Sequence, residues 1–101
     1  MSTWRTKQGD YHRRCTLDLT NISTAGASEV RFKMRKRGSS SLVVDALGTI
    51  VSATRVSYQF TGTQLDEPGT YVLEVVLTYV DGTERVPTVG YLTVYIEPNL
   101  G

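Results

Sequence analysis

The sequence has little of what enzymes and metal proteins commonly use: one cysteine and one histidine among 101 residues. A single cysteine excludes an intramolecular disulfide, so the chain is not one of the disulfide-stapled secreted mini-domains. One histidine and one cysteine are also too few for a typical zinc site, and no spacing typical of zinc ligands is present. We therefore expect no bound metal and no cofactor.

Long hydrophobic segments are also lacking. The most apolar run, YVLEVVLTYV at residues 71–80, is interrupted by Glu74 and Thr78, whereas a membrane-spanning helix needs about 20 apolar residues. The first fourteen residues contain no apolar segment of the kind found in signal peptides. We expect no association with a membrane.

The residues that could carry catalysis are each better explained by structure. His12 stands beside two arginines on an alternating segment, where we expect it to be exposed, and Cys15 falls on the apolar face, where a buried, inert thiol is expected. Asp66 and Glu67 precede a Pro-Gly turn, and GTQLDEPG lacks the Lys-Ser/Thr ending of a phosphate-binding loop. No catalytic residue is predicted.

What the sequence does have is a period of two, which indicates half-buried β-strands. We predict strands at residues 11–20, 30–36, 42–46, 50–53, 55–60, 70–79, 85–86 and 91–96, with Asp81-Gly82 as a hairpin turn. Seven or eight short antiparallel strands with frequent turns favour an all-β sandwich. The predicted organisation is a polar N-terminal arm at 1–10, the sandwich at 11–98 and a tail at 99–101.

One face of these strands is apolar and predicts the core. Its members are Leu17, Leu19, Val30, Phe32, Met34, Val56, Tyr58, Tyr71, Leu73, Val75 and Leu77.

The segment VRFKMRK alternates apolar residues with basic ones, and its basic face has three interpretations. It can be a solvated, edge-protecting face, a contact for an acidic protein surface, or a nucleic-acid site. Residues 1–37 hold nine basic and three acidic residues, against two and seven in residues 38–101, while the net charge is only +1. The single aromatic residue of the segment, Phe32, lies with the core residues. Both observations disfavour nucleic acid.

The stretch DEPGTY, ahead of a long alternating strand, resembles the tyrosine corner of immunoglobulin-like domains. The resemblance implies that Tyr71 is the corner residue, with its hydroxyl bonded back to the preceding loop. Leu73 stands where antibody domains have their second cysteine.

A wider resemblance covers residues 11–98. The ordered motifs LDLTNIST, VRFKMRKRG, LVVDALGTIV, RVSYQF, DEPGTYVLEVVLTYVDGTERVPT and GYLTVYIEP are similar to the N-terminal domain of the phage baseplate upper protein family. This resemblance implies an immunoglobulin-like β-sandwich that serves as a structural or attachment component of a bacteriophage virion, in the tail, the baseplate or the head. The expected partners are other virion proteins and copies of the chain itself.

Two functions therefore stay open. For the virion component, we expect a basic surface of one copy to face an acidic loop of another, anchored by apolar residues. The alternative is a free-standing module that binds a surface carbohydrate or protein through Trp4, Tyr91 or Tyr95. The predicted assembly surface comprises the basic residues Arg13, Arg14, Arg31, Lys33, Arg35 and Arg37, the acidic residues Asp66, Glu67 and Glu84, and the anchors Trp4 and Tyr11.

Overall fold

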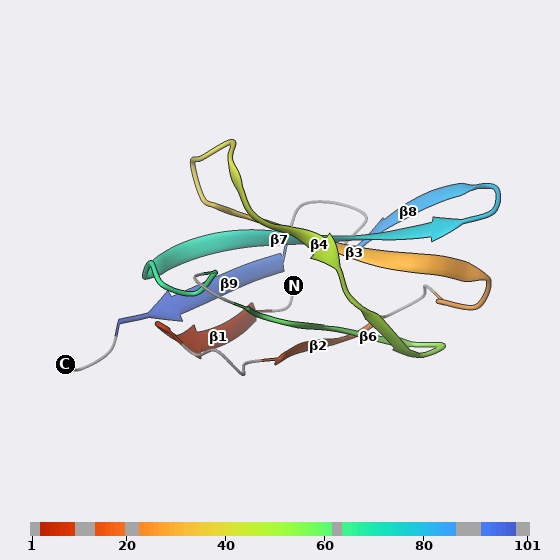
Figure 1. Ribbon diagram of the computed structural model, residues 1–101, viewed down its shortest axis with the longest axis horizontal. Coiled ribbons are helices and arrows are strands. Elements are labelled where there is room, and N and C mark those ends of the chain that lie inside the picture. The colour runs from red at the N-terminus through yellow and green to blue at the C-terminus, as the bar shows by residue number, and fades with distance from the viewer. Residues whose placement is uncertain (1–2, 10–13, 20–22, 62–63, 87–91, 99–101) are drawn as a thin grey trace.

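The computed structural model describes residues 3–9, 14–19, 23–61, 64–86 and 92–98, and these form strands and turns without a helix (Figure 1). The strands within these ranges are β1 (Thr3–Lys7), β2 (Arg14–Asp18), β3 (Ala27–Lys36), β4 (Leu42–Leu47), β5 (Thr49–Ser52), β6 (Arg55–Gln59), β7 (Gly69–Tyr79), β8 (Gly82–Val86) and β9 (Leu92–Glu97).

The strands make two sheets that pack together. The larger sheet has the order β1-β9-β7-β3-β4, with β8 paired to β7 beside β9, and the smaller sheet has the order β2-β6-β5. The predicted all-β class is confirmed. The described residues form nine strands rather than seven or eight, because the N-terminal segment Thr3–Lys7 is also a strand. The pairing is not wholly antiparallel either, since β1 runs parallel to β9.

The core lies between the sheets and is centred on the pair β3–β7. Phe32 lies opposite Val75 in this pair, with Met34 opposite Leu73 on one side of it. From the smaller sheet, Tyr58 stacks on Phe32 with ring centroids 5.4 Å apart. Ten of the eleven predicted core residues are buried, and the other, Leu17, is half-buried against the same cluster. The buried residues that the prediction omitted include Val44, Phe60, Leu65, Val94 and Ile96.

The N-terminal arm predicted at 1–10 is wrong over Thr3–Lys7, which is β1. In the parallel register Trp4 lies beside Val94, a fully buried residue. Because residues paired across two strands point to the same side of a sheet, the Trp4 ring also points inwards. It stacks there on Phe60, with ring centroids 5.2 Å apart. Residues Thr3–Lys7 therefore belong to the larger sheet.

The predicted hairpin after β7 is present, but its turn is one residue earlier than predicted. Tyr79 pairs with Gly82, which leaves Val80 and Asp81 as the two loop residues. The predicted interruption at Pro87 and Gly90 lies outside the described residues.

A single residue, Gly48, separates β4 from β5, and it is where the chain passes from the larger sheet to the smaller one. β4 pairs with β3, whereas β5 pairs with β6. A Cβ atom at Gly48 would lie 2.6 Å from the Phe32 ring and 2.6 Å from the carbonyl oxygen of Ser57. Neither group can move easily, because one is in the core and the other is backbone. The crossing therefore requires glycine for close approach.

Replacing Gly48 with alanine tests this close approach. We expect Gly48→Ala to lower the free energy of unfolding by about 3 kcal/mol, because the methyl group overpacks the junction of the two sheets. Gly38→Ala is the matched control, since its Cβ would meet nothing within 4 Å and only its positive φ is unfavourable, at about 1 kcal/mol. Urea unfolding of both variants measures the difference. Equal destabilisation would show that Gly48 has no special steric role.

Candidate assembly surface

The outer face of the larger sheet carries three of the predicted basic residues in one row along β3. Lys33 lies between Glu74 of β7 and Asp45 of β4 in the cross-strand register. Arg31 and Arg35 flank it on the same face and lie beside aliphatic residues of both neighbouring strands. The surface is therefore a mixture of basic, acidic and apolar side chains rather than a uniformly basic patch.

Two of these basic side chains bond within the molecule. The Arg31 guanidinium donates to the Asp45 carboxylate at 3.0 Å and to the Asp45 carbonyl oxygen at 3.3 Å. Arg35 donates to the carbonyl oxygen of Ser39 at 2.8 Å. Both bonds hold the β3–β4 hairpin. Because β3 is paired on both sides, by β7 and by β4, these two residues fit a solvated sheet face rather than the protection of an edge. Lys33 makes no hydrogen bond or ion pair to any other residue that the structure describes.

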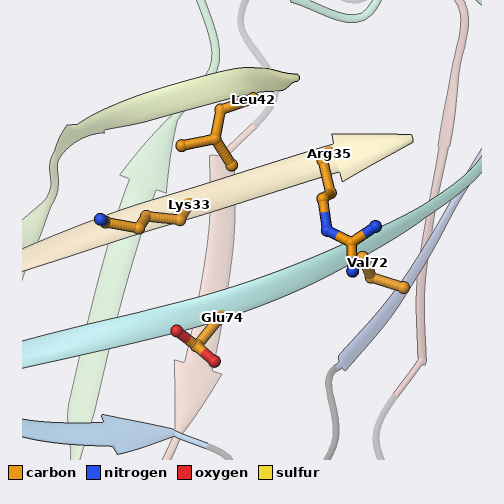
Figure 2. Close-up of a pocket in the computed structure, with 5 residues that line it drawn as sticks. All are labelled: Lys33, Arg35, Leu42, Val72 and Glu74. Carbon is orange, nitrogen blue, oxygen red and sulfur yellow. The ribbon is translucent and has the colours of Figure 1, made fainter. Parts of the chain in front are cut away.

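A small hollow of about 150 Å³ lies on this face, lined by Lys33, Arg35, Leu42, Val72 and Glu74 (Figure 2). Figure 2 shows Arg35 reaching from β3 towards Val72 of β7, while Lys33 extends along β3. Val72 is only 8% exposed although it points outwards. Glu74 pairs with Arg85 of β8 at 3.5 Å. The hollow can accept a carboxylate beside Lys33 and Arg35, with methylene groups against the two aliphatic residues.

The other predicted basic residues do not join this face. Arg14 lies on β2 of the smaller sheet, where it donates to Ser57 Oγ at 3.0 Å and to Gln59 Oε1 at 2.9 Å. The outer faces of two packed sheets point in opposite directions, so the prediction of one surface containing Arg14 and Arg31 is wrong. Arg37 follows β3 in an exposed turn. Arg13 lies outside the described residues.

The predicted acidic residues do not lie together in one loop. Asp66 and Glu67 precede the first residue of β7, whereas Glu84 lies on β8 opposite Leu77. Eight residues of extended strand separate Gly69 from Leu77, which is about 27 Å. Glu67 is also paired within the molecule, with Lys36. The prediction that these acids form one surface for a second copy is therefore wrong.

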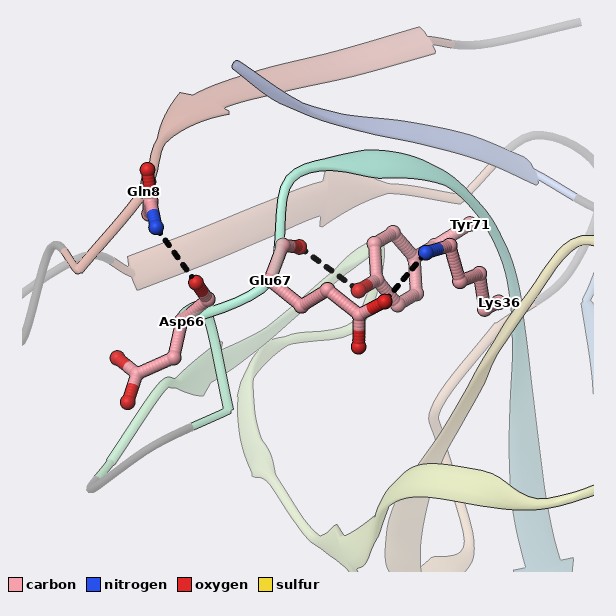
Figure 3. Close-up of polar contacts among 5 residues, drawn as sticks. All are labelled: Gln8, Lys36, Asp66, Glu67 and Tyr71. Carbon is pink, nitrogen blue, oxygen red and sulfur yellow. Dashed lines mark hydrogen bonds and ion pairs between the residues drawn. The ribbon is translucent and has the colours of Figure 1, made fainter. Parts of the chain in front are cut away.

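Tyr71 makes the hydrogen bond that the tyrosine-corner resemblance implies. Its hydroxyl donates to the carbonyl oxygen of Glu67 at 2.7 Å (Figure 3). Burial raises the pKa of Tyr71, and the negative charge of Glu67 raises it further. Gln8 Nε2 donates to the Asp66 carbonyl oxygen at 2.8 Å from the end of β1, and Lys36 reaches the Glu67 carboxylate from the end of β3. The loop is thus held by three strands.

The predicted apolar anchors are not at this surface. Trp4 is stacked on Phe60 between the sheets, so its prediction as an interface anchor is wrong, and Tyr11 lies outside the described residues. Tyr95 is half-buried beneath the Arg5 guanidinium, 4.6 Å from the ring centroid, and Tyr91 is not described. The sequence alone did not indicate the exposed aliphatic residues of β4 and β5, which are Leu42, Val43, Leu47 and Val51.

Cys15 and His12 are the cysteine and histidine that the sequence offers for catalysis or metal binding. Cys15 is fully buried, and burial raises the pKa of its thiol to about 12. His12 lies outside the described residues. Within the described ranges, no three His, Cys, Asp or Glu residues come together in a way that could hold a metal ion. The same part of the chain contains no helix long and apolar enough to cross a membrane.

Comparison with known proteins adds no assignment: no protein-family model and no curated protein matches the chain.

Removing the Tyr71 hydroxyl tests the corner. We expect Tyr71→Phe to lower the free energy of unfolding by about 1–2 kcal/mol, because the Glu67 carbonyl loses its donor in a partly buried loop. Tyr79→Phe is the matched control. Its hydroxyl also donates to a backbone carbonyl, that of Ser23, but at an exposed position where water can replace it. Urea unfolding that gave equal losses for both variants would contradict a special role for Tyr71.

The buried thiol predicts a loss of stability at alkaline pH. The unfolded thiol ionises near its ordinary pKa of 9.0, whereas the folded thiol stays protonated up to about pH 12. Between these values the folded state binds the additional proton, so stability falls as pH rises, by up to about 1.4 kcal/mol per pH unit. Below pH 9 the thiol contributes no slope. Denaturant unfolding of wild type and Cys15→Ala from pH 8 to 11 should show the steeper fall in wild type alone, and parallel curves would contradict the prediction.

Proposed function

We propose that this chain is an immunoglobulin-like β-sandwich. Its strand order supports the assignment: β2, β6 and β5 occupy the places of strands B, E and D, while β3, β7 and β9 occupy those of C, F and G. β4 extends the second sheet in the place of C′, as in variable-type domains. The Tyr71 bond to Glu67 at the start of β7 agrees with the corner at the start of strand F. Apolar packing replaces the disulfide, since the chain has one cysteine.

We further propose that the chain is a non-enzymatic structural or attachment component of a bacteriophage virion and acts through protein–protein contacts. The family resemblance of residues 11–98 suggests the virion setting. The observation that carries the contact is the hollow around Lys33, where an unpaired cation and Arg35 border aliphatic residues. Protein interfaces commonly have a polar rim around apolar contacts, and arginine is enriched in them. The proposed ligand is an acidic side chain of a neighbouring virion protein.

The alternative, recognition of a carbohydrate, has less support. Carbohydrate sites commonly present exposed aromatic rings, and the Trp4 ring is stacked on Phe60. The Tyr95 ring is covered on one face by Arg5.

Reversing the charge at the hollow tests the proposal. Lys33→Glu should still fold, because Lys33 makes no bond within the described part of the chain, although a third carboxylate between Asp45 and Glu74 lowers stability somewhat. It should lower the number of copies that co-purify with virions several-fold, since a carboxylate there repels an acidic partner. Quantitative mass spectrometry of particles assembled with each variant measures the copy number. Raised salt should weaken the wild-type contact.

Arg55→Glu is the control, because Arg55 is an exposed residue of the smaller sheet, where it pairs with Asp18 at 2.7 Å. It makes the same change of charge on the opposite face. Arg31 and Arg35 are left unchanged, because each bonds to the backbone of the β3–β4 hairpin. Normal incorporation of folded Lys33→Glu, or an equal loss with Arg55→Glu, would refute a specific contact at the hollow. Absence of the wild-type chain from purified virions would refute the virion role.

A further inference from the structure

The turn between β7 and β8 presents an apolar side chain that the fold itself does not use. Val80 and Asp81 are the two loop residues of this hairpin, and Val80 is 102% exposed. Two-residue hairpin loops favour Asn, Asp and Gly, which tolerate positive φ, and valine is not among them. Figure 1 shows the turn at the right-hand end of the molecule. Neither burial nor turn geometry accounts for a valine here, and its side chain is available to another molecule.

The same end of the molecule collects carboxylates that the described structure leaves without cations. Glu29 lies opposite Thr78, beside the hairpin that carries Asp81 and Glu84. None of these three acids makes an ion pair with another described residue. The acids that do make such ion pairs are Asp18, Asp45, Glu67, Glu74 and Glu97. The hairpin end is therefore acidic as well as apolar.

The acidic loop at the other end of β7 lacks this combination. Asp66 also has no ion pair with a described residue, but its neighbour Leu65 is buried and Glu67 is paired with Lys36. In the part of the chain that the structure describes, Val80-Asp81 is thus the one place where an unpaired carboxylate follows a large exposed hydrophobic residue.

The hollow on the outer face of the larger sheet has the complementary chemistry. Leu42 and Val72 supply aliphatic surface, and Lys33 supplies a cation that has no ion pair with a described residue. The hollow measures about 150 Å³, and a cavity of about this volume can hold a benzene molecule. The isopropyl group of a valine is smaller than benzene. The Val80 side chain can therefore lie against the two aliphatic residues while the Asp81 carboxylate reaches Lys33.

A copy cannot fill its own hollow with its own hairpin. Val72 and Val80 are eight residues apart along an extended strand, which is about 27 Å. β7 is paired on both sides along its length, so it cannot fold back. The occupant has to come from another molecule, and each copy can donate its hairpin and accept one at the same time.

We propose that the Val80-Asp81 hairpin tip of one copy docks in the hollow of a second copy. The contact joins two different surfaces, so it is heterologous, and its repetition gives a ring if the rotation closes and an open chain if it does not. The proposal rests on the proposed function in using the same hollow, and it names a second copy as the neighbour whose acidic side chain fills it.

A mixing experiment tests the two halves of the contact separately. Lys33→Glu disables the hollow, and Val80→Ser combined with Asp81→Asn disables the tip while keeping residues that suit a turn. In analytical ultracentrifugation up to about 1 mM, a range that reveals weak contacts, the mass of wild type should rise with concentration. Each variant alone should stay monomeric. Their equimolar mixture should form a one-to-one complex and nothing larger, because only one working tip and one working hollow remain in each pair.

The matched control makes the same two kinds of change elsewhere. Val51→Ser with Asp66→Asn removes an exposed valine and an unpaired carboxylate away from the tip and the hollow, and it should associate as wild type does. Circular dichroism confirms that each variant folds, and Lys33→Gln replaces Lys33→Glu if the latter does not. A monomeric wild type up to about 1 mM, a mixture that stays monomeric or grows beyond two copies, or an equal loss in the control would overturn the proposal.

Incorporation into virions separates this proposal from the proposed function. If Lys33→Glu lowers incorporation while the purified wild-type chain stays monomeric, a second copy is the wrong occupant and the virion contact stands. If the purified chains associate as expected but both variants are incorporated normally, the contact between copies stands and the virion contact at the hollow fails. An equal loss of incorporation by the tip and hollow variants, together with the one-to-one complex in the mixture, would support both.

Discussion

The antiparallel pairing of β3 with β7 is the constraint on which the rest of the structure depends. Its register places Val30, Phe32 and Met34 opposite apolar residues of β7, so that one face of the pair is continuous hydrophobic surface. β4 attaches to β3, and β8 and β9 attach to β7, while β1 attaches through β9. A shift of this register by one residue would move every one of these side chains to the outer face. The position of each remaining strand of the larger sheet therefore follows from this pair.

Local pattern predicted the structure wherever burial alternates along one strand. Phe32 and Leu73 were placed in the core correctly, because a period of two leaves no other face for them. Trp4 was not placed in the core, because TWRTK is a short run among polar residues. Its partner strand is β9, at the other end of the chain. Strands whose partners are so distant carry little local signal. Pattern gave the inward and outward residues of each strand but could not assign the strands to sheets.

The candidate surface was predicted only in part for the same reason. Arg31, Lys33 and Arg35 share a strand, so period two was enough to place them together. Arg14 belongs to another sheet, and that membership depends on long-range pairing with β6. The sequence could not show that Leu47 lies at the edge of a sheet either, because a strand is an edge strand only when no further strand pairs with its outer side. The charge pattern of β3 also has a physical explanation that sequence did not supply: two of its arginines satisfy backbone carbonyls of the adjoining hairpin.

Two different strands, β8 and β9, pair along one side of β7, and this affects which part of the sheet unfolds first. Residues Gly69–Leu73 pair with β9, and residues Val75–Tyr79 pair with β8. β9 contributes Val94 and Ile96 to the core, whereas residues 82–85 of β8 are exposed. Separating β8 from β7 thus withdraws none of these four side chains from the core, while separating β9 breaks the core itself. β8 and β9 then belong to different cooperative units, and amide hydrogens of β7 bonded towards β8 exchange with solvent through local fraying before those bonded towards β9.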